Sequence, residues 1–286
     1  MAESINAILR CWPLIGSLLA SVAVGGYPGA QGVRTISLTR VVHIPVRMVN
    51  AQETARDTMD GAGTLTLSAG AVDEAPDGPD GLDILDDGRL LVTDPLRRRI
   101  AVYNAKGTFR QEWKIGFAAD SVTVIPGGLV LVRDATTGQF HVFDRDGRPR
   151  SMEAATLPAP AEARVLTGNR GTVARPATEH TAGGALEIQF DQPGLRLLSL
   201  ESLATDRDGN TYVALETTAG GEVMEGISLN NYVRKYGTDG KLVCEVADIP
   251  LDYYVRPVDE LRVRKGIVYQ LMTTRSDVQI NEWDTN

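Results

Sequence analysis

The chain has 286 residues, of which 43% are hydrophobic and 23% are charged. This hydrophobic fraction excludes a disordered chain, and the length suffices for one large domain or two small ones. With 29 basic residues against 37 acidic ones, the net charge is −8. The chain is therefore a poor candidate for binding bare nucleic acid, which requires a surplus of cations.

The N-terminus carries an uncharged apolar run, CWPLIGSLLASVAVGG, directly after Arg10. The run is shorter than the ~20 residues of a bilayer span and fits the hydrophobic region of a signal peptide. A short buried N-terminal helix is the alternative. We expect residues 1–25 to be a signal peptide or an N-terminal apolar segment, with cleavage near residues 23–25. The protein would then be extracellular or periplasmic, and no other long apolar run follows.

The two cysteines are Cys11 and Cys244. Removal of a signal peptide would leave Cys244 without a partner for an intramolecular disulfide. Stability then has to come from packing of the core.

Two consecutive segments, residues 79–113 and 119–152, have the same pattern of landmarks at a shift of 40 residues. The matched pairs are Gly88 with Gly128, Val92 with Val132, Asp94 with Asp134, Ile100 with Phe140, Tyr103 with Phe143, and Gly107 with Gly147. Such internal repetition is typical of repeat architectures. The recurring aromatic side chains are expected in the core.

Further copies follow along the chain. The third occupies residues 203–243 and carries an insertion of 12 residues near Thr217–Leu229. The fourth, shorter copy is residues 258–283. We expect a degenerate copy at residues 160–198, where the strand-like sequence LEIQF stands at 186–190.

Each copy contains short β-prone runs separated by turn residues, among them the Asp-Gly pairs at 87–88, 146–147, 208–209 and 239–240. Asp-Gly between apolar runs is a strong hairpin signal, because a type I′ turn requires positive φ at both central positions. Four antiparallel strands in ~40 residues, repeated, predict the blades of a β-propeller. The fold class is therefore all-β.

The segment GLDILDDGRLLVTDPLRRRIAVYNAKGTF resembles the NHL-type repeat. That repeat has an apolar strand, an Asp/Asn-Gly turn, a hydrophobic-x-Val-x-Asp run, and then Arg-Ile-x-Val-aromatic. The second copy departs from it with Gln139 before Phe140, and the third has Leu215 in place of the Asp. The resemblance covers roughly residues 64–286 and also suits bacterial six-bladed β-propeller proteins. It implies a fold and is nearly silent on function, because propellers host unrelated activities.

The number of blades differs between the two lines of reasoning, since the repeat count favours five and the resemblance favours six. We expect the strand TLTLS at 64–68 to complete the last blade and close the sheet edge. The propeller domain would be residues 63–286, after an N-terminal extension at residues 26–62. If residues 33–49 form strands, a sixth blade becomes possible.

Candidate binding residues fall on the connections between second and third strands, which we call the loop face. They are Asp94, Arg97, Arg98 and Arg99 in the first copy, Asp134 in the second, and Glu222 and Glu225 in the insertion of the third. Loops on a rigid scaffold often carry function. The alternative is structural: the two aspartates cap their turns, and the arginines form a solvated face with one paired to a carboxylate of a neighbouring blade.

Two classes of function remain, and no catalytic residue is assigned. The first is a secreted or periplasmic binding or scaffold module, without a cofactor, for a protein, peptide or glycan. The alternative is a hydrolase or lyase that holds Ca²⁺ or another divalent ion in the central channel. Its ligands would be four acids at similar positions on the inner strands: Asp83, Asp120, Asp206 and Glu260.

Overall fold

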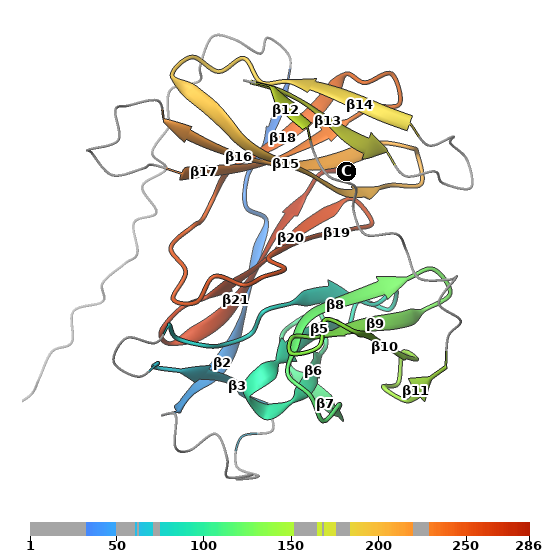
Figure 1. Ribbon diagram of the computed structural model, residues 1–286, viewed down its shortest axis with the longest axis vertical. Coiled ribbons are helices and arrows are strands. Elements are labelled where there is room, and N and C mark those ends of the chain that lie inside the picture. The colour runs from blue at the N-terminus through green and yellow to red at the C-terminus, as the bar shows by residue number, and fades with distance from the viewer. Residues whose placement is uncertain are drawn as a thin grey trace, which may run out of the picture. The chain divides into compact units, whose positions relative to one another are not determined.

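The computed structural model describes residues 33–49, 61, 63–70, 75–151, 165–167, 169–175, 184–219 and 229–286 (Figure 1). The segment expected to be a signal peptide, residues 1–25, lies outside this part of the chain. The described residues form 21 strands in five sheets and one short 3₁₀ helix. The predicted all-β class is confirmed, and five sheets agree with the repeat count. Within these ranges, no helix has the length and apolarity needed to span a bilayer.

The first two copies each form a four-stranded antiparallel sheet, as predicted. The first sheet consists of β4 (Leu82–Ile84), β5 (Leu90–Asp94), β6 (Arg99–Tyr103) and β7 (Phe109–Lys114), with the 3₁₀ helix η1 (Pro95–Arg97) between β5 and β6. The second sheet consists of β8 (Ala119–Ile125), β9 (Leu129–Asp134), β10 (Phe140–Phe143) and β11 (Pro149–Arg150). The chain runs through each in sequence order, because short turns join neighbouring antiparallel strands.

The turn between β10 and β11 depends on its glycine. Gly147 has a φ of +81°, and a Cβ at this position would collide with the indole ring of Trp113 on β7. Only glycine combines this left-handed conformation with such a close approach. The turn of the second sheet therefore rests directly on the first sheet.

The degenerate copy and the third copy form two further sheets. The degenerate copy is three-stranded, with β12 (Val165–Thr167), β13 (Arg170–Arg175) and β14 (Gly184–Gln189), which confirms the predicted strand at LEIQF. The third copy comprises β15 (Leu195–Thr205), β16 (Thr211–Ala219), β17 (Leu229–Tyr236) and β18 (Leu242–Ile249), with β1 (Arg34–Ile36) added parallel to β18. The centre of the insertion lies outside the described residues.

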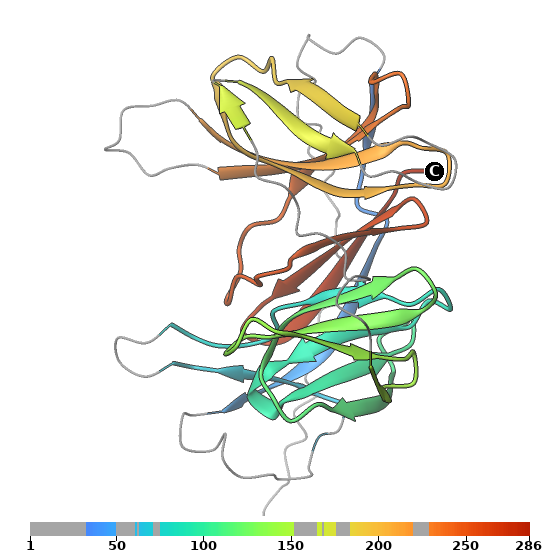
Figure 2. The same cartoon turned by 45° about the vertical axis from the view of Figure 1, so that its right-hand side comes forward.

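The last sheet is completed by the N-terminal part of the chain. Its own strands are β19 (Leu261–Arg264), β20 (Ile267–Thr273) and β21 (Asp277–Asp284). Strand β2 (Arg40–Val49) pairs antiparallel with β21, and β3 (Leu65–Ser68) pairs parallel with the far end of β2. Figures 1 and 2 show the blue strand β2 beside the red strand β21.

An N-terminal strand thus joins the C-terminal sheet as predicted. Residues 64–68 do not take the fourth position beside β21, which belongs to β2; β3 follows as the fifth strand. The alternation in β2 decides the pairing, because Val42 and Ile44 are buried in one cluster with Val278 and Ile280 of β21. Residues 33–49 add one strand to each of two existing sheets, β1 at an edge and β2 between β21 and β3, and they do not form a sheet of their own.

The cores lie between neighbouring sheets. Leu91, Ile100 and Val102 of the first sheet pack with Val122 and Val132 of the second. The recurring aromatic side chains are buried as predicted: Tyr103, Phe143 and Tyr236. The first strands of four copies contact one another: β4 lies against β8 and β19, and β19 lies against β15. This junction holds several charged side chains.

Candidate functional site

Asp83 on β4 joins three sheets at this junction. Its carboxylate is fully buried and accepts hydrogen bonds from the guanidinium of Arg264 on β19, at 2.9 Å from Nε and 2.7 Å from Nη2. The backbone N–H groups of Ile84 and of Val124 on β8 donate to it as well, each at 2.7 Å. Both oxygens are therefore occupied, and the charge is balanced by a bidentate arginine.

The other three acids proposed as metal ligands have separate partners. Asp120 lies 3.6 Å from the guanidinium of Arg133. Asp206 caps the turn between β15 and β16, accepting from the N–H groups of Asp208 and Asn210, and lies 3.3 Å from Lys235 Nζ. Glu260 pairs with Arg256 at 3.3 Å.

The structure does not bring these four acids into one group. In the described part of the chain, no three or more His, Cys, Asp or Glu side chains form a group that could hold a metal ion. Asp83 takes part in an ion pair between two sheets, Asp206 caps a turn, and Asp120 and Glu260 pair with arginines of their own sheet or segment.

Asp94 and Arg99, assigned to the loop face, form a buried ion pair. Arg99 Nε donates to Asp94 Oδ2 at 2.9 Å, and Nη1 donates to Glu112 at 2.7 Å. The two side chains are 0% and 2% exposed. The prediction that Asp94 caps its turn was wrong, because η1 has no side-chain cap. Arg99 belongs to β6, and its carboxylate partners are on its own sheet, not on a neighbouring one.

The remaining loop-face residues have different environments. Asp134 caps its turn as expected: it accepts from the N–H of Thr136 at 2.8 Å and from the hydroxyl of Thr137 at 2.9 Å. The Thr136 N–H stabilises the carboxylate and holds its pKa below the ordinary value. Arg97 donates to the carbonyl of Gly61, while Arg98 is exposed. Glu222 and Glu225 lie outside the described residues.

A cavity lies at the opposite end of the first two sheets from the loop face. It has a volume of about 660 Å³ and is lined by three turns, which we call the turn pocket: residues 85–87 after β4, 124–129 between β8 and β9, and 144–150 around the start of β11. Successive connections of an antiparallel sheet alternate between its ends, so these turns cannot share an end with the loop face. The predicted loop-face residues therefore lie at the other end of these sheets from this cavity.

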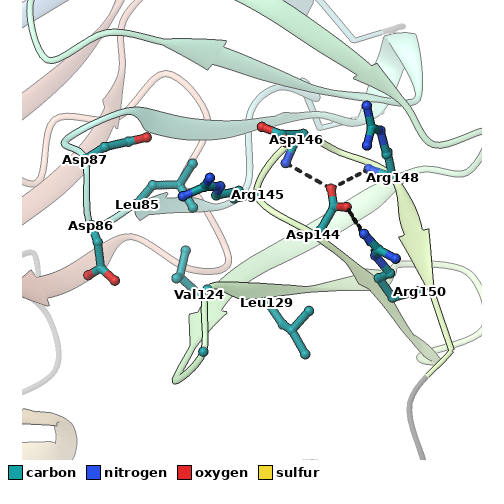
Figure 3. A pocket seen from close by; sticks show the side chains of 12 residues that line it. Leu85, Asp86, Asp87, Val124, Leu129, Asp144, Arg145, Asp146, Arg148 and Arg150 are labelled. Carbon is teal, nitrogen blue, oxygen red and sulfur yellow. Dashed lines mark hydrogen bonds and ion pairs between the residues drawn. The ribbon is translucent and has the colours of Figure 1, made fainter.

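Arginines and aspartates both line the turn pocket, with Asp86 and Asp87 on one side of it and Arg148 and Arg150 on the other (Figure 3). Asp144 accepts from the N–H groups of Asp146 and Arg148, each at 3.0 Å, and pairs with Arg150 at 2.7 Å. The Arg148 N–H contributes most to holding the pKa of Asp144 below its ordinary value. The guanidinium groups of Arg145 and Arg148 are exposed and have no ion-pair partner among the residues described. They are available to an incoming ligand.

The floor of the turn pocket is apolar. Leu85 of the first sheet and Val124 and Leu129 of the second line it beneath the charged groups. Pockets that combine an apolar floor with a few polar groups are typical of binding sites. The signal for this site in the sequence was the turn DRDGRPR at 144–150, which reads equally well as an ordinary hairpin turn.

Comparison with known proteins gives likeness in structure only. No protein-family model matches the chain. No curated protein matches it either.

Several solved structures are similar at low identity. A selenomethionine-substituted virginiamycin B lyase from Staphylococcus aureus is 11% identical with a TM-score of 0.38, over 86% of this chain and 99% of that one. A gluconolactonase from Xanthomonas campestris is 12% identical with a TM-score of 0.37, over 86% and 98%. A DUF4221 family member from Bacteroides vulgatus is 9% identical with a TM-score of 0.32, over 87% and 97%.

These neighbours include two enzymes, and at such values no activity comes to this chain from them. The all-β class rests on the five sheets described above. The solved structures that the chain matches are six-bladed β-propellers, the class that the NHL-type resemblance implied.

Proposed function

We propose that the protein is a secreted or periplasmic, non-enzymatic β-propeller that acts as a binding or scaffold module and holds a protein or peptide in the turn pocket. The observation that carries this proposal is the pair Arg145 and Arg148, both exposed and without an ion-pair partner in the described part of the chain, above an apolar floor. Arginine is enriched at protein interfaces and among the residues that dominate binding energy.

The charge of the turn pocket favours a polypeptide over a uniformly anionic ligand. Asp144 and Asp87 are paired with Arg150 and Arg89. The carboxylates of Asp86 and Asp146 balance the two unpaired guanidinium groups. A partner that presents both signs of charge and an apolar side chain matches this surface, and a peptide does so more readily than a glycan.

The proposed location rests on residues 1–25. A signal peptide would be absent from the mature protein. Fractionation of cells that express the chain, followed by mass measurement of the mature N-terminus, tests this independently of binding. Cleavage near residues 23–25 with export is the expected result, and an intact N-terminus in the cytoplasm would contradict it.

A displayed peptide library, panned against the purified protein, tests the binding function. We expect enriched peptides to lose about tenfold or more in affinity for the variant Arg145→Glu/Arg148→Glu. The matched control is Arg97→Glu/Arg98→Glu, which changes the same charges at the opposite end of the sheet. Failure to enrich any peptide, or equal losses in both variants, would overturn the proposal.

The metal-assisted hydrolase or lyase has less support. Asp83 would have to release Arg264 and two backbone amides to bind an ion. Asp206 and Glu260 already have cationic partners. A binding module is therefore the better supported of the two functions.

A further inference from the structure

A second cavity lies away from the turn pocket, between the β15–β17 part of the third-copy sheet and the segment 256–262 that leads into β19. Its volume is about 280 Å³. Leu203, Leu215 and Leu261 provide apolar walls. Its polar lining includes Glu201, Glu216, Asn231, Arg256 and Glu260. We call this cavity the carboxylate pocket.

Acidic groups outnumber basic ones in this cavity. Four carboxylates line it, those of Glu201, Glu216, Asp259 and Glu260, against two guanidinium groups, those of Arg256 and Arg262. Arg262 is held by Asp259 and by the carbonyl of Val122. Arg256 is therefore the cation that balances Glu216 and Glu260.

Arg256 is held loosely. Its side chain is 50% exposed, and its contacts with Glu216 and Glu260 are 3.3–3.4 Å long. The Arg264 pair with Asp83 is shorter, at 2.7–2.9 Å. Charge-assisted hydrogen bonds ordinarily measure about 2.7–2.9 Å. A second cation can therefore compete with Arg256 for the two glutamates.

Asn231 supplies an observation independent of the charge. Its side chain lines the cavity, the residue is 5% exposed, and its Nδ2 donates to Glu260 at 3.2 Å. Its Oδ1 is buried and has no hydrogen-bond partner among the described residues. Buried acceptors without a partner are rare in native proteins. No described residue provides the donor that this oxygen requires.

A primary ammonium group fits these requirements. It has three donors and no acceptor, and the two glutamates and Asn231 Oδ1 provide acceptors. The volume is just below that of pockets for drug-sized ligands, about 300–1,000 Å³, and suits an aminoalkyl chain. We infer that the carboxylate pocket binds a primary ammonium group, of a free alkylamine or of a lysine side chain, in competition with the guanidinium of Arg256. The inference does not depend on the turn pocket.

Titration calorimetry with three probes tests the inference on the full chain. The probes are cadaverine, Nα-acetyl-lysine methylamide, and the same lysine derivative acetylated at Nε, which is neutral and matched in shape. We expect saturable binding of at least one amine and none of the Nε-acetylated probe. Binding of cadaverine points to a free amine as the source, and binding of the lysine derivative alone points to a polypeptide. Equal binding of the neutral probe, or no binding of either amine, would overturn the inference.

Variants with opposite expected effects make the test specific. Glu216→Gln should weaken binding about tenfold, because it removes a charged acceptor. Arg256→Gln should tighten binding several-fold, because it removes the internal competitor. Glu187→Gln, an exposed acid on β14, is the control and should leave affinity unchanged. Weaker binding by Arg256→Gln in a chain with an unchanged circular dichroism spectrum would also overturn the inference.

Discussion

Asp80 lies where the first and last sheets are joined, and its carboxyl group is the most informative site for a stability measurement. The carbonyl of Asp80 accepts from the N–H of Asp259 at 2.8 Å, beside the parallel bridge between Gly81 and Asp259. Burial of the carboxyl, with Asp120 and Asp77 nearby, raises its pKa from 3.8 to about 7. The folded protein therefore holds this proton more tightly than the unfolded chain does.

The sign of the effect follows from linkage. Because the folded pKa is raised, Asp80 does not weaken the fold below pH about 4, and ionisation destabilises the fold progressively as the pH rises toward 7. The full shift would correspond to about 4 kcal/mol at 1.36 kcal/mol per unit. Asp80 is only partly buried, so we discount for solvent screening and expect about 2 kcal/mol.

The variant Asp80→Asn isolates this contribution, because asparagine keeps the shape and stays neutral. Urea unfolding at pH 8 should show the variant more stable than the wild type by about 2 kcal/mol. The difference should fall to about half that at pH 4.5 and approach zero near pH 3. Asp252→Asn, at an exposed site, should change stability at neither pH. A difference for Asp80→Asn that does not depend on pH would refute the reasoning.

Three further outcomes are expected. Asp83→Ala removes the buried acceptor of Arg264 and of the N–H groups of Ile84 and Val124, and it should lower the free energy of unfolding by about 1–3 kcal/mol. No loss in urea unfolding would show that the Asp83–Arg264 pair contributes little to stability. Gly147→Ala should lower the free energy of unfolding by about 1–3 kcal/mol and alter the near-UV circular dichroism of Trp113. Gly138→Ala is the control, because Gly138 also has a positive φ but open space around it, and it should lower stability less. Equal losses in the two variants would contradict the role of the close approach. Elemental analysis should find no stoichiometric divalent ion, and chelation should leave Tm unchanged; a chelation-dependent melt would revive the metal-assisted enzyme.

The local elements of the fold could be predicted because their signals lie close together in the sequence. The Asp-Gly pairs at 87–88 and 146–147 determine the turns β4–β5 and β10–β11 without reference to the rest of the chain. The partner of β21 could not be predicted, since VVHIPV and TLTLS both alternate and the choice depends on packing against Val278 and Ile280. Pairing of distant strands is decided by that packing.

The candidate site was only partly accessible from the sequence. The sequence predicts Asp94 and Arg99 to be exposed loop residues, because a charged side chain is rarely buried unless it is paired. Their pairing depends on the tertiary structure, which the sequence pattern does not show. The turn at 144–150 was recognised as a turn. This turn lies beside the turns at 85–87 and 124–129 because of the way the two sheets pack, and no local sequence pattern predicts that packing.

The long sequence separation of the inter-sheet contacts has a kinetic consequence. The Asp83–Arg264 pair joins residues 181 positions apart, and the Arg40–Glu282 pair joins residues 242 apart. Chains dominated by such non-local contacts fold slowly, because loop closure has to precede the stabilising contact. Synthesis at roughly 5–20 residues per second leaves β2 without its partner β21 until the last part of the chain has emerged. During that interval β2 presents an unpaired edge, so the nascent chain is exposed to aggregation until β21 pairs with it.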